Sequence, residues 1–162
     1  MTRKADFSKK NLAHASFRGE DFTEAELSET NLQGASLRDA NLRGAQLRGA
    51  DMSHDDFRGA SLIGAQMENT QLPGAHLAGV DLSNANLHGA NLEGADLRDA
   101  NLNGVDLRHA NLVGANLTGS NIEAAATLAG ANLRDVIGLT EEQMDACRTR
   151  WAVTDRETSE SR

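Results

Sequence analysis

The chain has 162 residues, of which 39% are hydrophobic, 25% are charged and only 3% are aromatic. Its formal net charge of −8 disfavours non-specific binding to nucleic acid or to an anionic membrane, because both need an excess of lysine and arginine. The single cysteine, Cys147, excludes a disulfide within the chain and a zinc site built from several thiolates.

The N-terminal residues, Met1 to Asp6, run directly into polar sequence. A secretory signal or a membrane span would need a long apolar stretch, and the sequence has none, so we expect neither. We therefore expect a cytoplasmic protein, and the length suits a single domain.

An apolar residue occupies every fifth position from Phe7 to Ile122, which we call the central position. All 24 central positions hold leucine, methionine, phenylalanine or isoleucine. Two residues earlier lies the alanine position, where 16 of the 24 residues are alanine, and one residue earlier lies the Asx position, which prefers asparagine or aspartate. Two residues after the central position lies the corner position, which holds 13 of the 15 glycines.

A period of five fits neither an α-helix nor a straight strand. On a helix, a step of five residues turns by about 140°, so the central residues would spiral around every face. On a strand, the odd step would place successive central residues on opposite faces. A chain that turns a corner once per five residues points all of them inward. Four such units then form a square coil of about twenty residues, and the coils stack at about 4.8 Å.

The pattern resembles the A-(D/N)-L-x-x consensus of the pentapeptide-repeat family over roughly residues 5–135. Clear copies are Ala40-Asn41-Leu42-Arg43-Gly44, Ala90-Asn91-Leu92-Glu93-Gly94 and Ala95-Asp96-Leu97-Arg98-Asp99. The resemblance implies an all-β fold, a right-handed quadrilateral β-helix. We expect Phe7, Phe17 and Phe22, which are bulky and lie in the first coil, to plug its N-terminal end.

One residue is inserted after Ile122, and the register resumes at Leu128 and Leu133. We therefore predict a β-helix over residues 1–138 with a register break at 123–127, in the form of a bulge or a widened corner. A short C-terminal α-helical cap should follow over 139–152, and residues 153–162 are polar and predicted to be disordered.

The predicted C-terminal helix begins with a capping box formed by Thr140 and Gln143. Met144, Cys147 and Trp151 form one apolar stripe at helical spacing. This stripe either covers the last coil or forms the contact of a homodimer, and the two roles are compatible. The resemblance favours a dimer, because related quinolone-resistance proteins dimerise through C-terminal helices.

The sequence offers no catalytic, cofactor-binding or metal-binding site. The five histidines occupy outward-facing positions, and only His88 and His109 are expected to be neighbours. Asp55 replaces the usual alanine, so its charge should bend outward or find a partner. A rod filled with leucine also lacks a cavity for a substrate, so we expect no enzyme.

Charges differ between the sides of the coil. Steps of twenty residues align Arg18, Arg38, Arg58 and Arg98 on one side, where neighbouring aspartates should neutralise them. The side through Asp21, Glu24, Asp81 and Glu123 carries one compensating base, Arg43, and is the candidate acidic interaction face.

Two functions follow from these features. The chain is either a non-enzymatic scaffold or protein-binding solenoid with an unknown partner, or a DNA mimic. The second is implied by the resemblance, since some family members resemble B-DNA in width and acidity and bind DNA gyrase or topoisomerase IV. Because residues 5–122 run without projecting loops, the loop-free mycobacterial type is the closer comparison. Direct binding to nucleic acid or to membranes is not expected.

Overall fold

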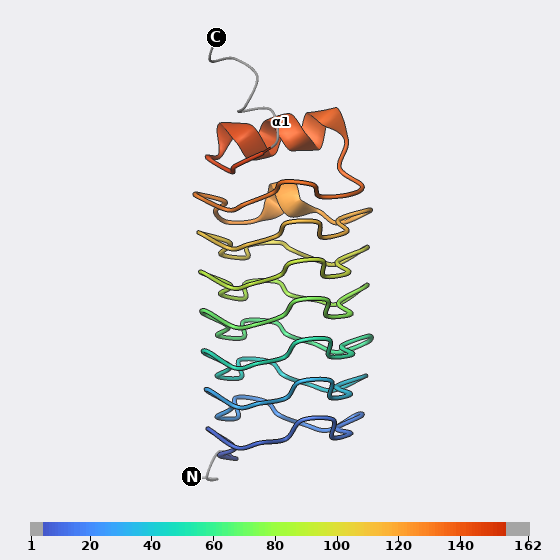
Figure 1. Cartoon of the computed structure of the whole chain (residues 1–162), viewed down its shortest axis with the longest axis vertical. Coiled ribbons are helices and arrows are strands. Elements are labelled where there is room, and N and C mark those ends of the chain that lie inside the picture. Colours follow the sequence, from blue (N-terminus) through green and yellow to red (C-terminus); the bar gives the residue numbers. More distant parts are fainter. Residues whose placement is uncertain (1–4, 155–162) are drawn as a thin grey trace.

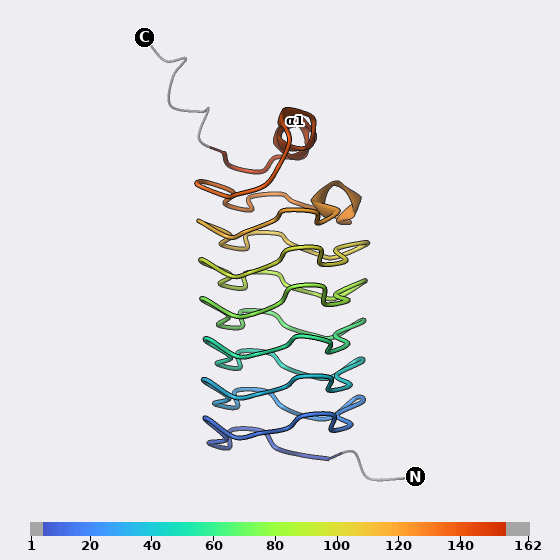
Figure 2. The same ribbon diagram turned by 90° about the vertical axis from the view of Figure 1, so that its right-hand side faces the viewer.

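The computed structural model describes residues 5–154 and shows a rod of stacked coils with a helix at its C-terminal end (Figure 1). A view at right angles shows the same regular stacking (Figure 2). Two helical elements lie in this range, the 3-10 helix η1, Ile122–Ala124, and the α-helix α1, Glu141–Thr149. Neither has the length and the apolar character that crossing a bilayer requires.

Each coil pairs with the next through parallel bridges between residues twenty positions apart, such as Asn31 with Asp51. The bridges form four columns, and we name the four sides of the rod after the first residue of each column. The Asp6 side continues through Glu26, Gln46, Gln66, Asn86, Asp106 and Thr127. The Asn11 side continues through Asn31, Asp51, Gln71, Asn91, Asn111, Asn132 and Val153. The Ser16 side continues through Ser36, Asp56, His76, Asp96, Asn116 and Ile137. The Asp21 side continues through Asn41, Ser61, Asp81 and Asn101.

The sides are too short to contain continuous strands. In each unit the Asx residue forms the bridge, and the chain turns a corner two residues after the central one. Around Leu42, for example, the Asn41 N–H donates to the Glu20 carbonyl at 3.0 Å and the Leu42 N–H to the Ser61 carbonyl at 2.8 Å. The Ala45 N–H then closes the corner on the Leu42 carbonyl at 3.1 Å. The predicted β architecture is therefore built from single bridges, because every fifth residue must turn.

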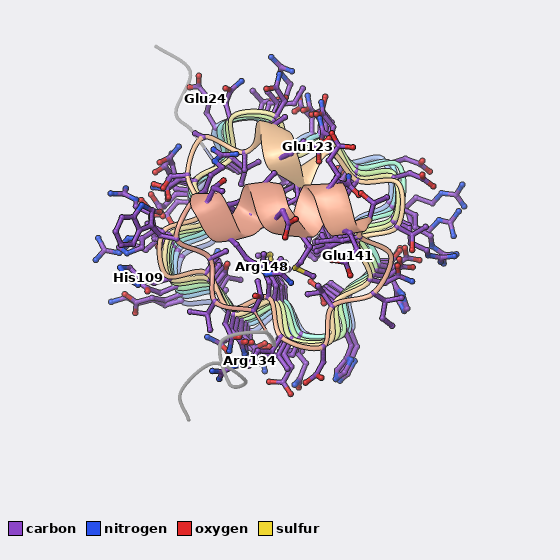
Figure 3. All side chains as sticks on the ribbon, turned by 90° about the horizontal axis from the view of Figure 1, so that it is seen from above. Glu24, His109, Glu123, Arg134, Glu141 and Arg148 are labelled. Carbon is purple, nitrogen blue, oxygen red and sulfur yellow. The ribbon has the colours of Figure 1, made fainter. Side chains whose placement is uncertain are left out.

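The core is a continuous column of central side chains. Every central residue from Leu27 to Leu133 is at most 1% exposed, including those on both sides of η1. The alanines beside them are buried as well, so that a coil is one side chain deep on each side. Seen down the rod, the coils superpose as a four-sided outline, and the polar side chains radiate outward (Figure 3).

The inserted residue is absorbed by η1. Bridges before it join residues twenty apart, as in Asp96 with Asn116, whereas those across it join residues twenty-one apart, as in Asn111 with Asn132. Ile122 keeps its central position at 0% exposure, so the extra residue is accommodated in the turn that follows. The guanidinium of Arg150 donates to the carbonyls of Glu123 (2.7 Å) and Ala125, which supplies partners for the widened turn.

The C-terminal helix caps the last complete coil (Figures 1 and 3). The Gln143 N–H donates to the Thr140 hydroxyl at 3.1 Å, and the Gln143 amide oxygen accepts from the Thr140 N–H at 3.1 Å, so the capping box is present. Gln143 also donates from Nε2 to the Ser120 carbonyl at 3.3 Å. These bonds hold α1 above the Asp21 side.

The chain returns to the coil after α1, earlier than the predicted boundaries allow. The helix ends at Thr149, and Val153 bridges to Asn132 on the Asn11 side. Thr154 is 1% exposed and lies at the next central position. Residues 153 and 154 therefore belong to an eighth, partial coil, while residues 155–162 of the predicted tail lie outside the described range.

Corner residues adopt a left-handed backbone, which glycine tolerates best. Gly94 has φ +63, and a Cβ added there would have no heavy atom within 4 Å, so only the backbone conformation opposes a side chain. Asn69 and Asn84 occupy the same corner position with φ of 56 and 58. Asparagine is more tolerant of this region than alanine.

Substitution of Gly94 tests the corner directly. We expect Gly94→Ala to lower the free energy of unfolding by about 1–2 kcal/mol, and Gly94→Asn to lower it by clearly less. Urea unfolding followed by circular dichroism gives both values. Equal losses for the two variants would contradict the assignment of the corner to backbone strain.

Candidate functional site

Many polar side chains on the outer walls are already engaged, because residues at the Asx position accept hydrogen bonds from the backbone of their own turn. The Asp21 carboxylate accepts from the Thr23 N–H at 3.0 Å and from the Thr23 hydroxyl at 2.6 Å, and these bonds lower the Asp21 pKa. Asn31 likewise accepts from the Gln33 N–H at 3.0 Å. An acid at the Asx position is therefore already engaged in stabilising its own turn.

The Ser16 side neutralises itself, as the sequence predicts. Arg58 donates to both carboxylate oxygens of Asp56, at 2.8 and 2.7 Å, and Arg38 lies 3.7 Å from the same carboxylate. The hydrogen bonds from Arg58 hold the pKa of Asp56 at about 2. Arg98 repeats the two-bond contact with Asp96 at the same distances.

The predicted acidic face gathers on the Asp21 side but is discontinuous. Its Asp81 carboxylate accepts from Asn101 Nδ2 at 3.0 Å and from the Ser83 N–H at 2.9 Å. Glu123, near the C-terminal end, accepts from Gln143 Nε2 at 3.0 Å and is thus attached to α1. Neutral residues and one base separate the four predicted acids along this side: Asn41, Arg43, Ser61 and Asn101.

Two open hollows lie on this part of the surface. One, of about 380 Å³, follows the corner of the Asp21 side and is lined by Thr23, Glu24, Arg43, Gly44, Ile63, Gly64 and Asn84. The other, of about 260 Å³, lies between η1 and α1 and is lined by Glu123, Glu142, Gln143 and Ala146. At the first hollow, the Thr23 hydroxyl donates to the Asp21 carboxylate at 2.6 Å, but this bond belongs to the local turn. The residues that line the second hollow include no hydroxyl or thiol that could act as a nucleophile.

The histidines do not converge on a metal site. His88 and His109 are neighbours, with ring centroids 5.7 Å apart. Over residues 5–154, no group of three or more histidine, cysteine, aspartate or glutamate side chains is arranged to hold a metal ion.

The structure separates the three residues of the predicted dimer stripe. Cys147 is 0% exposed, so it covers the last coil and cannot contact another chain, and burial raises the pKa of its thiol to about 11. Met144 is half-buried, whereas Trp151 is 82% exposed. The stripe breaks because the helix ends at Thr149, and Trp151, with φ 67, occupies a corner position of the partial coil.

Asp55 follows the second of the two expected outcomes, because its carboxyl stays inside and finds a partner in the backbone of the preceding coil. The side chain is 0% exposed and accepts from the Ala35 N–H at 2.9 Å, while the second oxygen has no hydrogen-bond partner. Burial raises the Asp55 pKa to about 8, and the nearby charge of Asp51 adds to the shift. The carboxyl is therefore mostly protonated at neutral pH.

This burial predicts a pH dependence of stability. The folded pKa of about 8 exceeds the unfolded value of 3.8, so the stabilising contribution of the bound proton is complete below pH 4 and is lost as the pH rises toward 8. We expect the wild type to lose a few kcal/mol over this range relative to Asp55→Asn, which has no proton to lose. Urea unfolding at several pH values measures the difference, and parallel profiles for the two proteins would refute it.

The chain resembles known proteins in sequence. A family model described as pentapeptide repeats matches residues 5–44, 40–79, 60–99, 86–123 and 95–137. Solved structures similar to the chain include HetL, a pentapeptide repeat protein involved in heterocyst differentiation regulation from the cyanobacterium Nostoc sp. strain PCC 7120. It is 26% identical, with 94% of this chain and 86% of that chain covered and a TM-score of 0.43.

QnrB1, a plasmid-mediated fluoroquinolone resistance protein, is 19% identical, with 96% of this chain and 93% of that chain covered and a TM-score of 0.44. A pentapeptide repeat protein from the thylakoid lumen of Arabidopsis thaliana is 27% identical, with 86% and 78% covered and a TM-score of 0.37. A search of curated proteins found no match to this chain.

Proposed function

This chain belongs to the pentapeptide-repeat family, whose fold is a right-handed quadrilateral β-helix, and we propose that it is a non-enzymatic solenoid that binds a protein partner on its outer walls. The observation that carries the proposal is the filled interior, in which every central side chain from Leu27 to Leu133 is at most 1% exposed. Enzymes need a concave site with convergent polar groups, and a one-side-chain-thick core leaves no room for one. Binding through flat walls is the function that this shape supports best.

The Asp21 side is the wall that we assign to the partner. Five acids lie along it (Glu20, Asp21, Glu24, Asp81 and Glu123) against the single base Arg43. The Ser16 side, in contrast, pairs its arginines with its aspartates. A partner surface rich in lysine or arginine would therefore be attracted to the Asp21 side in preference to its neighbour.

DNA mimicry is the alternative, and the charge density disfavours it. Seven coils at about 4.8 Å make a rod of roughly 30 Å, and B-DNA of that length carries about 18 phosphate charges. The whole chain has a net charge of −8, and the acids of the Asp21 side are interrupted by neutral residues. A protein that replaces DNA on a topoisomerase would need a more continuous acidic stripe.

An assay with DNA gyrase distinguishes the two functions. We expect the purified chain, at micromolar concentration, neither to inhibit supercoiling nor to protect the enzyme from a fluoroquinolone. The measurement is gel electrophoresis of plasmid topoisomers over a titration of the chain. Inhibition or protection at stoichiometric amounts would favour the DNA mimic and overturn the scaffold assignment.

The choice of wall is tested with two matched double variants. Asp21→Asn/Asp81→Asn removes two charges from the Asp21 side and keeps the oxygen that binds the turn. Asp96→Asn/Asp106→Asn makes the same change at the same position of the repeat on two other sides. A partner recovered by affinity capture is then purified and titrated against each variant. We expect about a fivefold or larger loss of affinity for the first variant only, and equal behaviour of the two would rule out the Asp21 side.

A further inference from the structure

The first coil differs from all the others in its alanine positions. From Ala25 to Ser120 these positions are buried, as at Ala25 (2%) and Ala45 (0%). In the first coil, the same position holds Lys10 on the Asn11 side and Glu20 on the Asp21 side, and both are exposed. Within residues 5–154, neither side chain forms an ion pair. One positive and one negative side chain are thus exposed at alanine positions of the first coil.

The same end also exposes aromatic core. Phe7 and Phe17 each make an edge-to-face contact with Phe22, with ring centroids 5.7 and 5.4 Å apart. Phe22 is 6% exposed, but Phe7 and Phe17 are only half-buried, whereas Phe57 in the third coil is 0% exposed. The predicted phenylalanine plug is therefore present as a cluster that still shows an apolar surface.

The backbone of the first coil is paired on its inner edge. The Asn31 N–H donates to the Lys10 carbonyl at 2.9 Å, and the Ser36 N–H donates to the Ala15 carbonyl at 2.9 Å. The equivalent N–H groups of Asn11 and Ser16 find no main-chain acceptor among the described residues. An unpaired edge beside an apolar cluster is a surface that readily pairs with another chain.

The positions of Lys10 and Glu20 indicate that the partner at this end is a second copy of the same chain. The two residues are ten positions apart, half of a twenty-residue coil, so they lie diagonally across the square from each other, each one residue after a corner position. A two-fold axis in the plane of the end, running along the other diagonal, exchanges these positions. In such a pair, Lys10 of each copy faces Glu20 of the other, which is the reciprocity that an isologous interface requires.

We propose that two copies of this chain associate head to head through their first coils, with Lys10 and Glu20 forming two reciprocal ion pairs around the phenylalanine cluster. A second copy fits better than an unrelated protein, because the alanine positions of this end carry one positive and one negative charge that the symmetry operation interchanges. The apolar rings at the centre then become buried, and burial of aromatic surface supplies the main stabilisation.

Charge reversal tests the pairing by the mass of the full chain in analytical ultracentrifugation. We expect the wild type to approach twice the 17.3 kDa of one chain as concentration rises. Lys10→Glu and Glu20→Lys should each weaken association by about tenfold or more, since each places like charges together twice. The double variant Lys10→Glu/Glu20→Lys should associate like the wild type, and the two single variants should form a heterodimer when they are mixed.

Two control variants distinguish this interface from a general effect of charge and from a contact at the C-terminal end. Arg48→Glu makes the same charge change as Lys10→Glu at an exposed wall position and should leave association unchanged. Trp151→Ala removes the exposed tryptophan at the other end and should also leave it unchanged. At about 100 µM even a weak dimer is populated, so the proposal fails if the wild type stays monomeric there. It also fails if the double variant does not recover association, or if Trp151→Ala abolishes the dimer.

Discussion

The hydrogen bonds between residues twenty positions apart are the constraint on which the rest of the molecule depends. Each unit donates and accepts along the axis of the rod, as Leu42 does to Ser61 and Asn41 does to Glu20, so every interior coil satisfies the backbone of two neighbours. This pairing requires that all coils have the same length. One added residue after Ile122 is accepted only because η1 and the guanidinium of Arg150 provide a separate set of partners for the widened turn.

Regular stacking also decides what the surface can offer. Central side chains fill the axis, alanines fill the inner corners, and the Asx side chains bind the N–H two residues further on, as Asp81 does with Ser83. The side chains that are not engaged in this way lie mainly at the residue after the central position and at the corner position. Charges on neighbouring coils lie about 5 Å apart, so unpaired like charges would repel, and Arg58 with Asp56 shows how the Ser16 side avoids this. The walls therefore suit broad recognition better than catalysis.

The period of five was sufficient to predict the core, because only a turning chain can point residues such as Leu42 and Leu133 to one axis. The capping box of α1 was equally visible, since it depends on residues three positions apart. Sequence reasoning missed features that depend on neighbouring coils or on where a helix stops. Asp55 remains inside because the Ala35 N–H of the preceding coil binds it. Trp151 leaves the apolar stripe because the chain returns to the coil directly after Thr149.

A solenoid has an open coil at each end that must be covered. The two ends of this rod differ in how they are covered, and the difference affects how copies can assemble. At the C-terminal end, α1 covers the last coil, and its Cys147 side chain is buried. At the N-terminal end, the described residues leave the half-buried Phe7 and Phe17 beside charges of both signs. A contact between unlike ends would add copies without limit, whereas a contact of the N-terminal end with itself uses up the surface after two copies. The exposed first coil can thus be covered without creating a fibre, because at the far end α1 and the partial coil of Val153 and Thr154 take the place of the complete open coil that a continued stack would need.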